Sequence, residues 1–138
     1  MDVSDQKKPV ILVVEQDADQ RDLLASTVID AGCSVLLAQA GEPAIQILRK
    51  REGLIDWLYT EVRLAGPVDG CRVADEFRFS HPLRPVIFAS ANRSDRARCL
   101  SGDLFLSKPV LPLRLTELLK DLQSRHFEEP LLFRFRDR

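Results

Sequence analysis

The sequence predicts an α/β fold in which a five-stranded parallel sheet carries helices on both faces. Two observations lead to this prediction. Short apolar segments rich in branched residues alternate along the chain with segments whose apolar residues recur at helical spacing. Parallel strands need a crossover between them, and helical crossovers cover both sides of the sheet. The 138 residues are enough for one such domain, which can hold a core without disulfides or a metal.

Five short apolar segments are predicted to form the strands. The first, Pro9 to Val14, is continuously apolar and is followed at once by acids, as is typical of a strand buried on both faces. The other four follow in chain order: Cys33 to Ala38, Leu54 to Thr60, Pro85 to Ser90 and Leu104 to Leu106.

Helices are predicted between the strands, where apolar residues recur every three or four positions. Asp17 is the expected N-cap of the first helix, and Gly32 stands where a helix C-terminus favours glycine. The apolar positions of this helix are Leu23, Leu24, Val28 and Ile29. Later helices are expected at Glu42 to Arg51, at Gly70 to Phe79, in the short, Arg-rich stretch Asn92 to Leu100, and at Leu113 to Arg125.

Composition argues against several functional classes. Lys and Arg total 20 and Asp and Glu total 21, so the chain lacks the basic field of a nucleic-acid binder and no nucleic-acid partner is expected. No apolar run is long enough to span a bilayer, and the first residues lack the apolar stretch of a signal peptide. We therefore expect no membrane partner and a cytoplasmic location. Cys33, Cys71 and Cys99 are widely spaced and odd in number, which predicts reduced thiols and no zinc site.

Polar side chains follow the strands at positions that a parallel sheet brings to one edge. Glu15 and Gln16 follow the first strand, Glu61 the third, Ser90 ends the fourth, and Lys108 follows the fifth. Ligands bind at this edge in open α/β sheets, so these residues predict a small polar pocket in which a carboxylate meets an ammonium. Carboxylates that lie close together can also bind the magnesium ion of a magnesium–phosphate site. No Gly-rich loop follows the first strand, which argues against a Rossmann or Walker nucleotide site.

Taken in order, these segments resemble the receiver domain of two-component response regulators, the CheY-like family, over about residues 9–124. The resemblance rests on five motifs in register: Ile11 to Asp17, Asp56 to Leu64, Gly66 to Gly70, Pro85 to Ala91 and Phe105 to Pro109. It implies the flavodoxin-like (βα)5 topology and a role in phosphorelay signal transduction. It also implies a phospho-acceptor position at Glu61, an acidic pair at Glu15 and Gln16, a switch at Ser90 and Phe105, and a phosphate-pairing lysine at Lys108.

The acidic positions depart from the family pattern. The family's acceptor is Asp, whereas Glu61 carries one more methylene, which moves its carboxylate by about 1.5 Å. Gln16 stands where the family has a second acid, so the magnesium site loses an anionic ligand. Phosphoryl transfer depends on positioning and on charge neutralisation by the metal. We therefore expect no cofactor, a degenerate magnesium site and no ordinary phosphorylation.

Several side chains leave alternatives open. Glu61 either mimics the phosphorylated state or merely balances Lys108 at a site that has decayed. Arg63 is expected to be a solvated loop arginine, and replacement of the missing metal is the alternative. Phe105 lacks the hydroxyl of the commoner Tyr and is expected to pack into the core instead of switching. The arginines between Ser90 and Lys108, in a stretch shorter than is typical of the family, form either a solvated face or a surface for an acidic partner.

These observations predict a stand-alone, atypical receiver at residues 9–124 that is not an enzyme. It is expected to work without phosphorylation, by contact with a protein such as a histidine kinase or a downstream effector. Residues 1–8 are expected to be a disordered lead-in. Residues 125–138 form a tail whose alternating Phe and Arg are typical of a strand that adds to a sheet edge or covers a neighbour in a homodimer, and an unordered terminus is the alternative. The alternatives are low-level phosphorylation on Glu61 or elsewhere, and a small magnesium-dependent hydrolase or phosphatase that uses Glu15, Glu61 and Lys108.

Overall fold

A parallel sheet organises the part of the chain that the structure, a computed structural model, describes, namely residues 8–51, 53–100 and 102–125. The strands are β1 (Val10–Val14), β2 (Ser34–Ala38), β3 (Trp57–Glu61), β4 (Ile87–Ser90) and β5 (Leu104–Ser107). They lie in the order β2-β1-β3-β4-β5, and every neighbouring pair is parallel, as the alternating pattern predicts. The strand order reverses at β1, and in sheets of this kind ligands bind at the carboxyl ends of the strands beside such a reversal, here β1 and β3.

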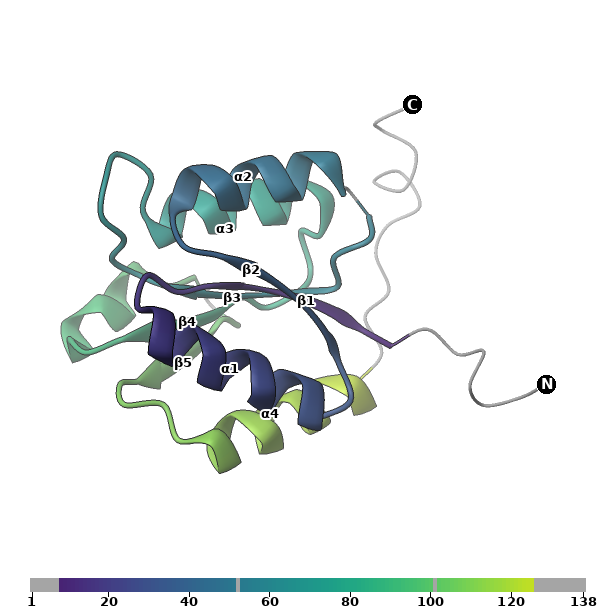
Figure 1. The fold of residues 1–138 in the computed structure, drawn as a ribbon. Helices are drawn as coiled ribbons and strands as arrows, with labels where there is room; N and C mark the ends of the chain where they lie inside the picture. The colour runs from purple at the N-terminus through teal and green to yellow at the C-terminus, as the bar shows by residue number, and fades with distance from the viewer. Residues whose placement is uncertain (1–7, 52, 101, 126–138) are drawn as a thin grey trace.

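Helices cover both faces of the sheet (Figure 1). Helices α1 (Ala18–Asp30) and α4 (Pro112–Ser124) pack together on one face, and α2 (Gly41–Lys50) and α3 (Gly70–Ser80) pack together on the other. The crossover from β4 to β5 carries only a short 3-10 helix, η2 (Arg93–Arg98), where the other crossovers carry α-helices. The expected short, Arg-rich element between these strands is therefore confirmed.

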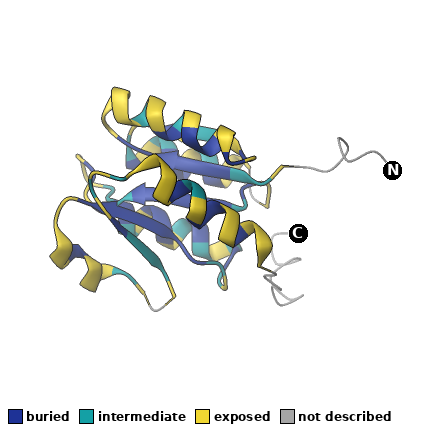
Figure 2. Ribbon diagram, turned by 90° about the horizontal axis from the view of Figure 1, so that it is seen from below, coloured by how far each residue is buried: buried dark blue, intermediate teal, exposed yellow. Residues whose placement is uncertain are grey.

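The core lies in two layers, one on each face of the sheet. Figure 2 shows the central strands buried and the outer sides of the helices exposed. Alternate residues of β1 serve the two layers: Ile11 and Val13 pack toward α1 and α4, while Leu12 and Val14 pack toward α2 and α3. All four are fully buried, which explains why the first strand is a continuous apolar run. No helix in the described part of the chain is both long and apolar enough to cross a membrane.

Helix α1 buries a narrower stripe than its sequence suggests. The Asp17 side chain caps it, as predicted, by accepting a hydrogen bond from the Gln20 N–H at 2.9 Å. Leu24 and Val28 are buried, but Leu23 and Ile29 are 52% and 54% exposed. At about 100° per residue, Leu24 and Val28 lie about 40° apart, while the other two apolar residues lie about 100° to either side of this stripe. The spacing of the apolar residues therefore predicts the helix correctly. The buried face of the helix is narrower than the four apolar positions suggest.

The ends of some elements differ from the prediction. The third strand begins at Trp57 and not at Leu54, because the Leu54 N–H donates to the Arg51 carbonyl at 2.9 Å in a turn that precedes the strand. Residues 1–7 of the expected lead-in lie outside the described residues. The tail expected at 125–138, with its strand or homodimer contact, also lies outside them from position 126 onward.

Candidate functional site

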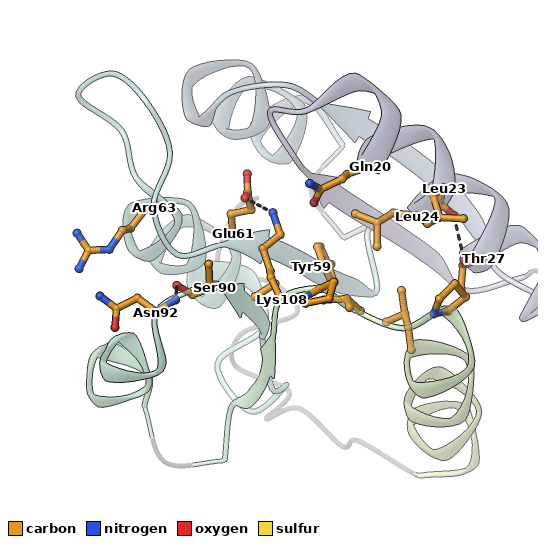
Figure 3. A pocket seen from close by; sticks show the side chains of 16 residues that line it. Gln20, Leu23, Leu24, Thr27, Tyr59, Glu61, Arg63, Ser90, Asn92 and Lys108 are labelled. Carbon is orange, nitrogen blue, oxygen red and sulfur yellow. Dashed lines mark hydrogen bonds and ion pairs between the residues drawn. The ribbon is translucent and has the colours of Figure 1, made fainter.

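Glu15, Glu61 and Lys108 meet at the carboxyl edge of the sheet, as the sequence predicts. The Lys108 ammonium donates to Glu15 Oε1 at 2.9 Å and makes a second, short hydrogen bond to Glu61 Oε1 (Figure 3). The Glu15 side chain is 1% exposed, and those of Glu61 and Lys108 are 12% and 16% exposed. One cation therefore bridges two nearly buried carboxylates, one just after β1 and the other at the end of β3.

Backbone hydrogen bonds hold this cluster in place. The Glu15 N–H continues the ladder beyond β1 by donating to the Ala38 carbonyl at 3.1 Å. The Lys108 N–H donates to the Ser90 carbonyl at 2.9 Å and so fixes the end of β5 against the end of β4. The short Gly70 N–H to Val62 carbonyl contact, at 2.9 Å, draws the start of α3 against the end of β3.

The charges of the cluster shift the pKa values of its members. Burial raises the pKa of the Glu15 carboxyl, and the nearby Glu61 adds to this effect, whereas the hydrogen bond from Lys108 opposes it. For Lys108, burial alone would lower the pKa, but the hydrogen bonds to Glu61 and Glu15 outweigh burial and raise it. The lysine therefore stays charged at neutral pH and remains the counter-ion of both acids.

The oxygens that the magnesium ion implied by the resemblance would use already accept hydrogen bonds. Besides their contacts with Lys108, Glu15 Oε2 accepts from the Asp17 N–H at 3.1 Å and Glu61 Oε2 accepts from the Gln16 N–H at 3.3 Å. The Gln16 side-chain oxygen accepts from the Ala65 N–H at 2.6 Å. All four carboxylate oxygens of the two acids thus already accept hydrogen bonds, and Lys108 supplies the positive charge that a metal would bring. Magnesium needs near-octahedral oxygen ligands, so these hydrogen-bond donors would have to give way before it could bind.

Ser90 is tied to a residue that sequence analysis missed. Its hydroxyl donates to Asp95 Oδ2 at 2.7 Å and accepts from the Asn92 N–H at 3.0 Å. Asp95 lies in η2, is 1% exposed, and also accepts two hydrogen bonds from Arg63, at 2.9 and 2.8 Å. The hydrogen bond from Arg63, followed by that from Ser90, holds the pKa of the Asp95 carboxyl below its usual range.

Arg63 is a largely exposed loop arginine, as expected, but it is ion-paired with Asp95 and does not take the place of the metal. Its side chain is 65% exposed, yet it forms an ion pair with the buried Asp95 and does not contact the cluster of Glu15, Glu61 and Lys108. Little in the sequence pointed to Asp95 as a partner, because a single acid among the arginines of a short polar stretch is typical of a solvated face.

Ser90 and Phe105 lie on neighbouring strands but are not directly opposite each other in the ladder. The Ser90 residue faces Ser107 across the ladder, whereas Phe105 faces Phe88. Phe105 lies half-buried against the core layer that α2 and α3 cover, in keeping with its expected place in the core. The hydroxyl of Ser90 points instead to η2, as described above.

Comparisons with known proteins agree with this geometry. Residues 11–120 match the family model of the response regulator receiver domain. The chain is 32% identical over 103 residues to YrkP, an uncharacterized transcriptional regulatory protein of Bacillus subtilis, and 34% identical over 112 residues to the sensor histidine kinase RcsC of Escherichia coli. These matches cover 72% and 78% of this chain but 42% and 12% of the two relatives, so the chain spans less than half the length of either.

Solved structures show the same fold. A response regulator receiver protein from Sinorhizobium medicae matches with a TM-score of 0.74 and 25% identity, over 85% of this chain and 98% of that chain. The matched sequence, the strand order and the acids and lysine gathered at one edge lead to the same conclusion. The chain belongs to the response regulator receiver domain family.

Proposed function

We propose that this receiver domain of two-component signalling works without phosphorylation of Glu61 and acts by contact with a protein partner. The observation that supports this most strongly is the Lys108 bridge between Glu15 and Glu61. A receiver that accepts a phosphoryl group needs an acceptor carboxylate that can be positioned in line with the donor, and a metal to neutralise the incoming charge. Both Glu61 oxygens accept hydrogen bonds, and their donors would have to give way before a metal could bind.

Ser90 supports the same proposal. To respond to a group on Glu61, its hydroxyl would have to give up Asp95 at 2.7 Å, a carboxylate that is buried and also bound by Arg63. Removing a partner from a buried charge is costly, so the contact opposes such a movement. Lys108 is hydrogen-bonded to Glu15 and Glu61, and Ser90 is hydrogen-bonded to Asp95. Together these contacts favour one fixed arrangement of the site.

The hydrolase or phosphatase alternative has less support. A serine nucleophile needs a base that takes its proton. The Ser90 hydroxyl donates to Asp95, whose pKa lies below its usual range, and Lys108 is held as an ammonium by two acids. Neither partner is suited to remove the Ser90 proton at neutral pH.

A partner from two-component signalling is the natural candidate for the protein contact. One relative is itself a sensor histidine kinase, and another is a transcriptional regulatory protein. We infer that the partner is a histidine kinase or a downstream effector, and that it reads the fixed surface of the domain.

The experiment that tests this proposal is amide NMR of the labelled chain, with magnesium added first and beryllofluoride second. The wild type is expected to show no coupled shifts at Glu15, Glu61 and Ser90. The double variant Glu61→Asp, Gln16→Asp restores both family acids and is the matched control, expected to gain a magnesium-dependent response. Saturable, coupled shifts at these sites in the wild type would overturn the proposal.

A further inference from the structure

A cavity of about 630 Å³ lies beside the Glu61–Lys108 contact (Figure 3). Its walls come from α1, from the ends of β3 and β4, from the segment that joins β5 to α4, and from the start of α4. This volume falls in the range that holds small organic ligands, roughly 300–1,000 Å³. The cavity also opens at the carboxyl edge of the sheet, where α/β proteins of this topology bind their ligands.

The lining of this cavity is mainly apolar. Leu24 from α1, Val110 from the joining segment and Leu115 from α4 belong to or pack against one core layer. Polar groups, among them Gln20 and Asn92, line the same cavity. An apolar wall with a few polar groups is the usual make-up of a small-molecule site.

Tyr59 is the feature that points to a ligand. It lines the cavity and is 0% exposed, and its hydroxyl has no hydrogen-bond partner among the described residues. A buried tyrosine hydroxyl normally has a partner, because an unsatisfied polar group costs folding free energy. Two other polar side chains at this end are already committed: Ser90 binds Asp95, and Lys108 binds two carboxylates.

The charges around Tyr59 define the kind of group that suits it. Burial, followed by the charges of Glu15 and Glu61, raises the pKa of the Tyr59 phenol, so the hydroxyl keeps its proton and donates it. An anionic group would face Glu61, and a cationic group would face Lys108 and Arg63. A neutral acceptor avoids both penalties.

We propose that this cavity binds a small neutral organic molecule that has an apolar ring-sized body and one hydrogen-bond acceptor. The acceptor takes the hydrogen of the Tyr59 hydroxyl, and the body packs against Leu24, Val110 and Leu115. The site is independent of phosphorylation and would give the domain a chemical input that reaches both α1 and the segment after Lys108.

Three probe molecules of similar size and shape test the proposal. Acetophenone carries a neutral hydrogen-bond acceptor, benzoate carries a negative charge, and ethylbenzene has no acceptor. Each is titrated into the labelled chain and followed by amide NMR. Acetophenone is expected to give saturable shifts at Leu24, Ser90 and Val110, and benzoate to bind about tenfold more weakly or worse. Tyr59→Phe is expected to weaken acetophenone about fivefold and to leave ethylbenzene unchanged, since it removes only the hydroxyl.

One variant that blocks the cavity and one matched control show whether the probe binds in the cavity. Ala91 lines the cavity and is exposed, so Ala91→Trp is expected to abolish acetophenone binding without disturbing the core. Ala97, which is exposed on η2 and does not line the cavity, gives the control Ala97→Trp, which should bind as the wild type does. The proposal is overturned by the absence of saturable shifts, by equal affinity in Tyr59→Phe, or by binding that persists in Ala91→Trp. None of these results bears on the response to magnesium and beryllofluoride.

Discussion

Arg63 and Asp95 are joined by two parallel hydrogen bonds, from Nε to Oδ2 at 2.9 Å and from Nη2 to Oδ1 at 2.8 Å. The paired geometry is the one in which a guanidinium binds a carboxylate most strongly. Because Arg63 follows β3 and Asp95 lies in η2, the pair fastens the short crossover over the end of the sheet. The same carboxylate holds the Ser90 hydroxyl, so the three residues form one unit.

Replacement of Arg63 tests the strength of this unit. Arg63→Gln leaves the buried Asp95 carboxylate without its cation, and the free energy of unfolding is expected to fall by clearly more than in an exposed control variant. Urea denaturation measures the change. Arg93→Gln, at an exposed position of η2, is the control and should change the free energy by less than about 0.5 kcal/mol. A loss of equal size in both variants would mean that the paired hydrogen bonds contribute nothing.

The pH dependence of stability should reveal the Asp95 carboxyl. Its pKa is lowered in the folded state, first by the hydrogen bond from Arg63, so the unfolded chain binds this proton more tightly. The stabilisation is therefore complete above the unfolded pKa, near 4, and is lost as the pH falls through the lower folded value. Denaturation curves between about pH 6 and pH 2.5 should show a shallower acid loss in Asp95→Asn than in the wild type. Parallel curves for the two proteins would contradict this assignment.

At position 70 the backbone of α3 lies so close to the end of β3 that only glycine, which has no Cβ, fits there. A Cβ at this position would lie 1.8 Å from the backbone oxygen of Glu61. Gly70→Ala is expected to lower the free energy of unfolding by about 3 kcal/mol, because backbone at the end of β3 must move. Gly53→Ala is the comparison: its Cβ would meet nothing within 4 Å, so the variant bears only the strain of a positive φ, about 1 kcal/mol. Thermal or urea unfolding of both variants decides, and equal losses would exclude the steric explanation.

Local sequence patterns were enough to predict the sheet and the place of its charged cluster. Strand burial follows from the apolar run that ends at Val14, and the parallel topology brings Glu15, Glu61 and Lys108 to one edge whatever the loops do. The Asp17 cap depends only on residues three positions apart, so the sequence predicted it as well.

Contacts that depend on loop geometry could not be predicted in the same way. The Arg63–Asp95 pair joins residues 32 positions apart, and it forms only because the short crossover folds back over the sheet. Tyr59 belongs to an apolar strand, where its ring alone explains its place, and only the packed structure shows that its hydroxyl has no partner among the described residues. The amide of Gln16 likewise binds Ala65 from a distant loop. Side-chain hydrogen bonds of this range leave no periodic pattern in the sequence.

Removal of Lys108 tests whether the lysine takes the place of a metal between Glu15 and Glu61. Lys108→Met leaves two nearly buried carboxylates without a counter-ion, and the free energy of unfolding should fall by about 3 kcal/mol at neutral pH. Burial already raises the pKa of Glu15, and a raised carboxyl pKa means that stability is lost as the pH rises through the folded value. The loss should therefore be larger at pH 8 than at pH 5, and the double variant Lys108→Met, Glu61→Gln should recover part of it. Urea denaturation at the two pH values measures both effects, and a loss that is independent of pH would show that Lys108 acts by packing alone.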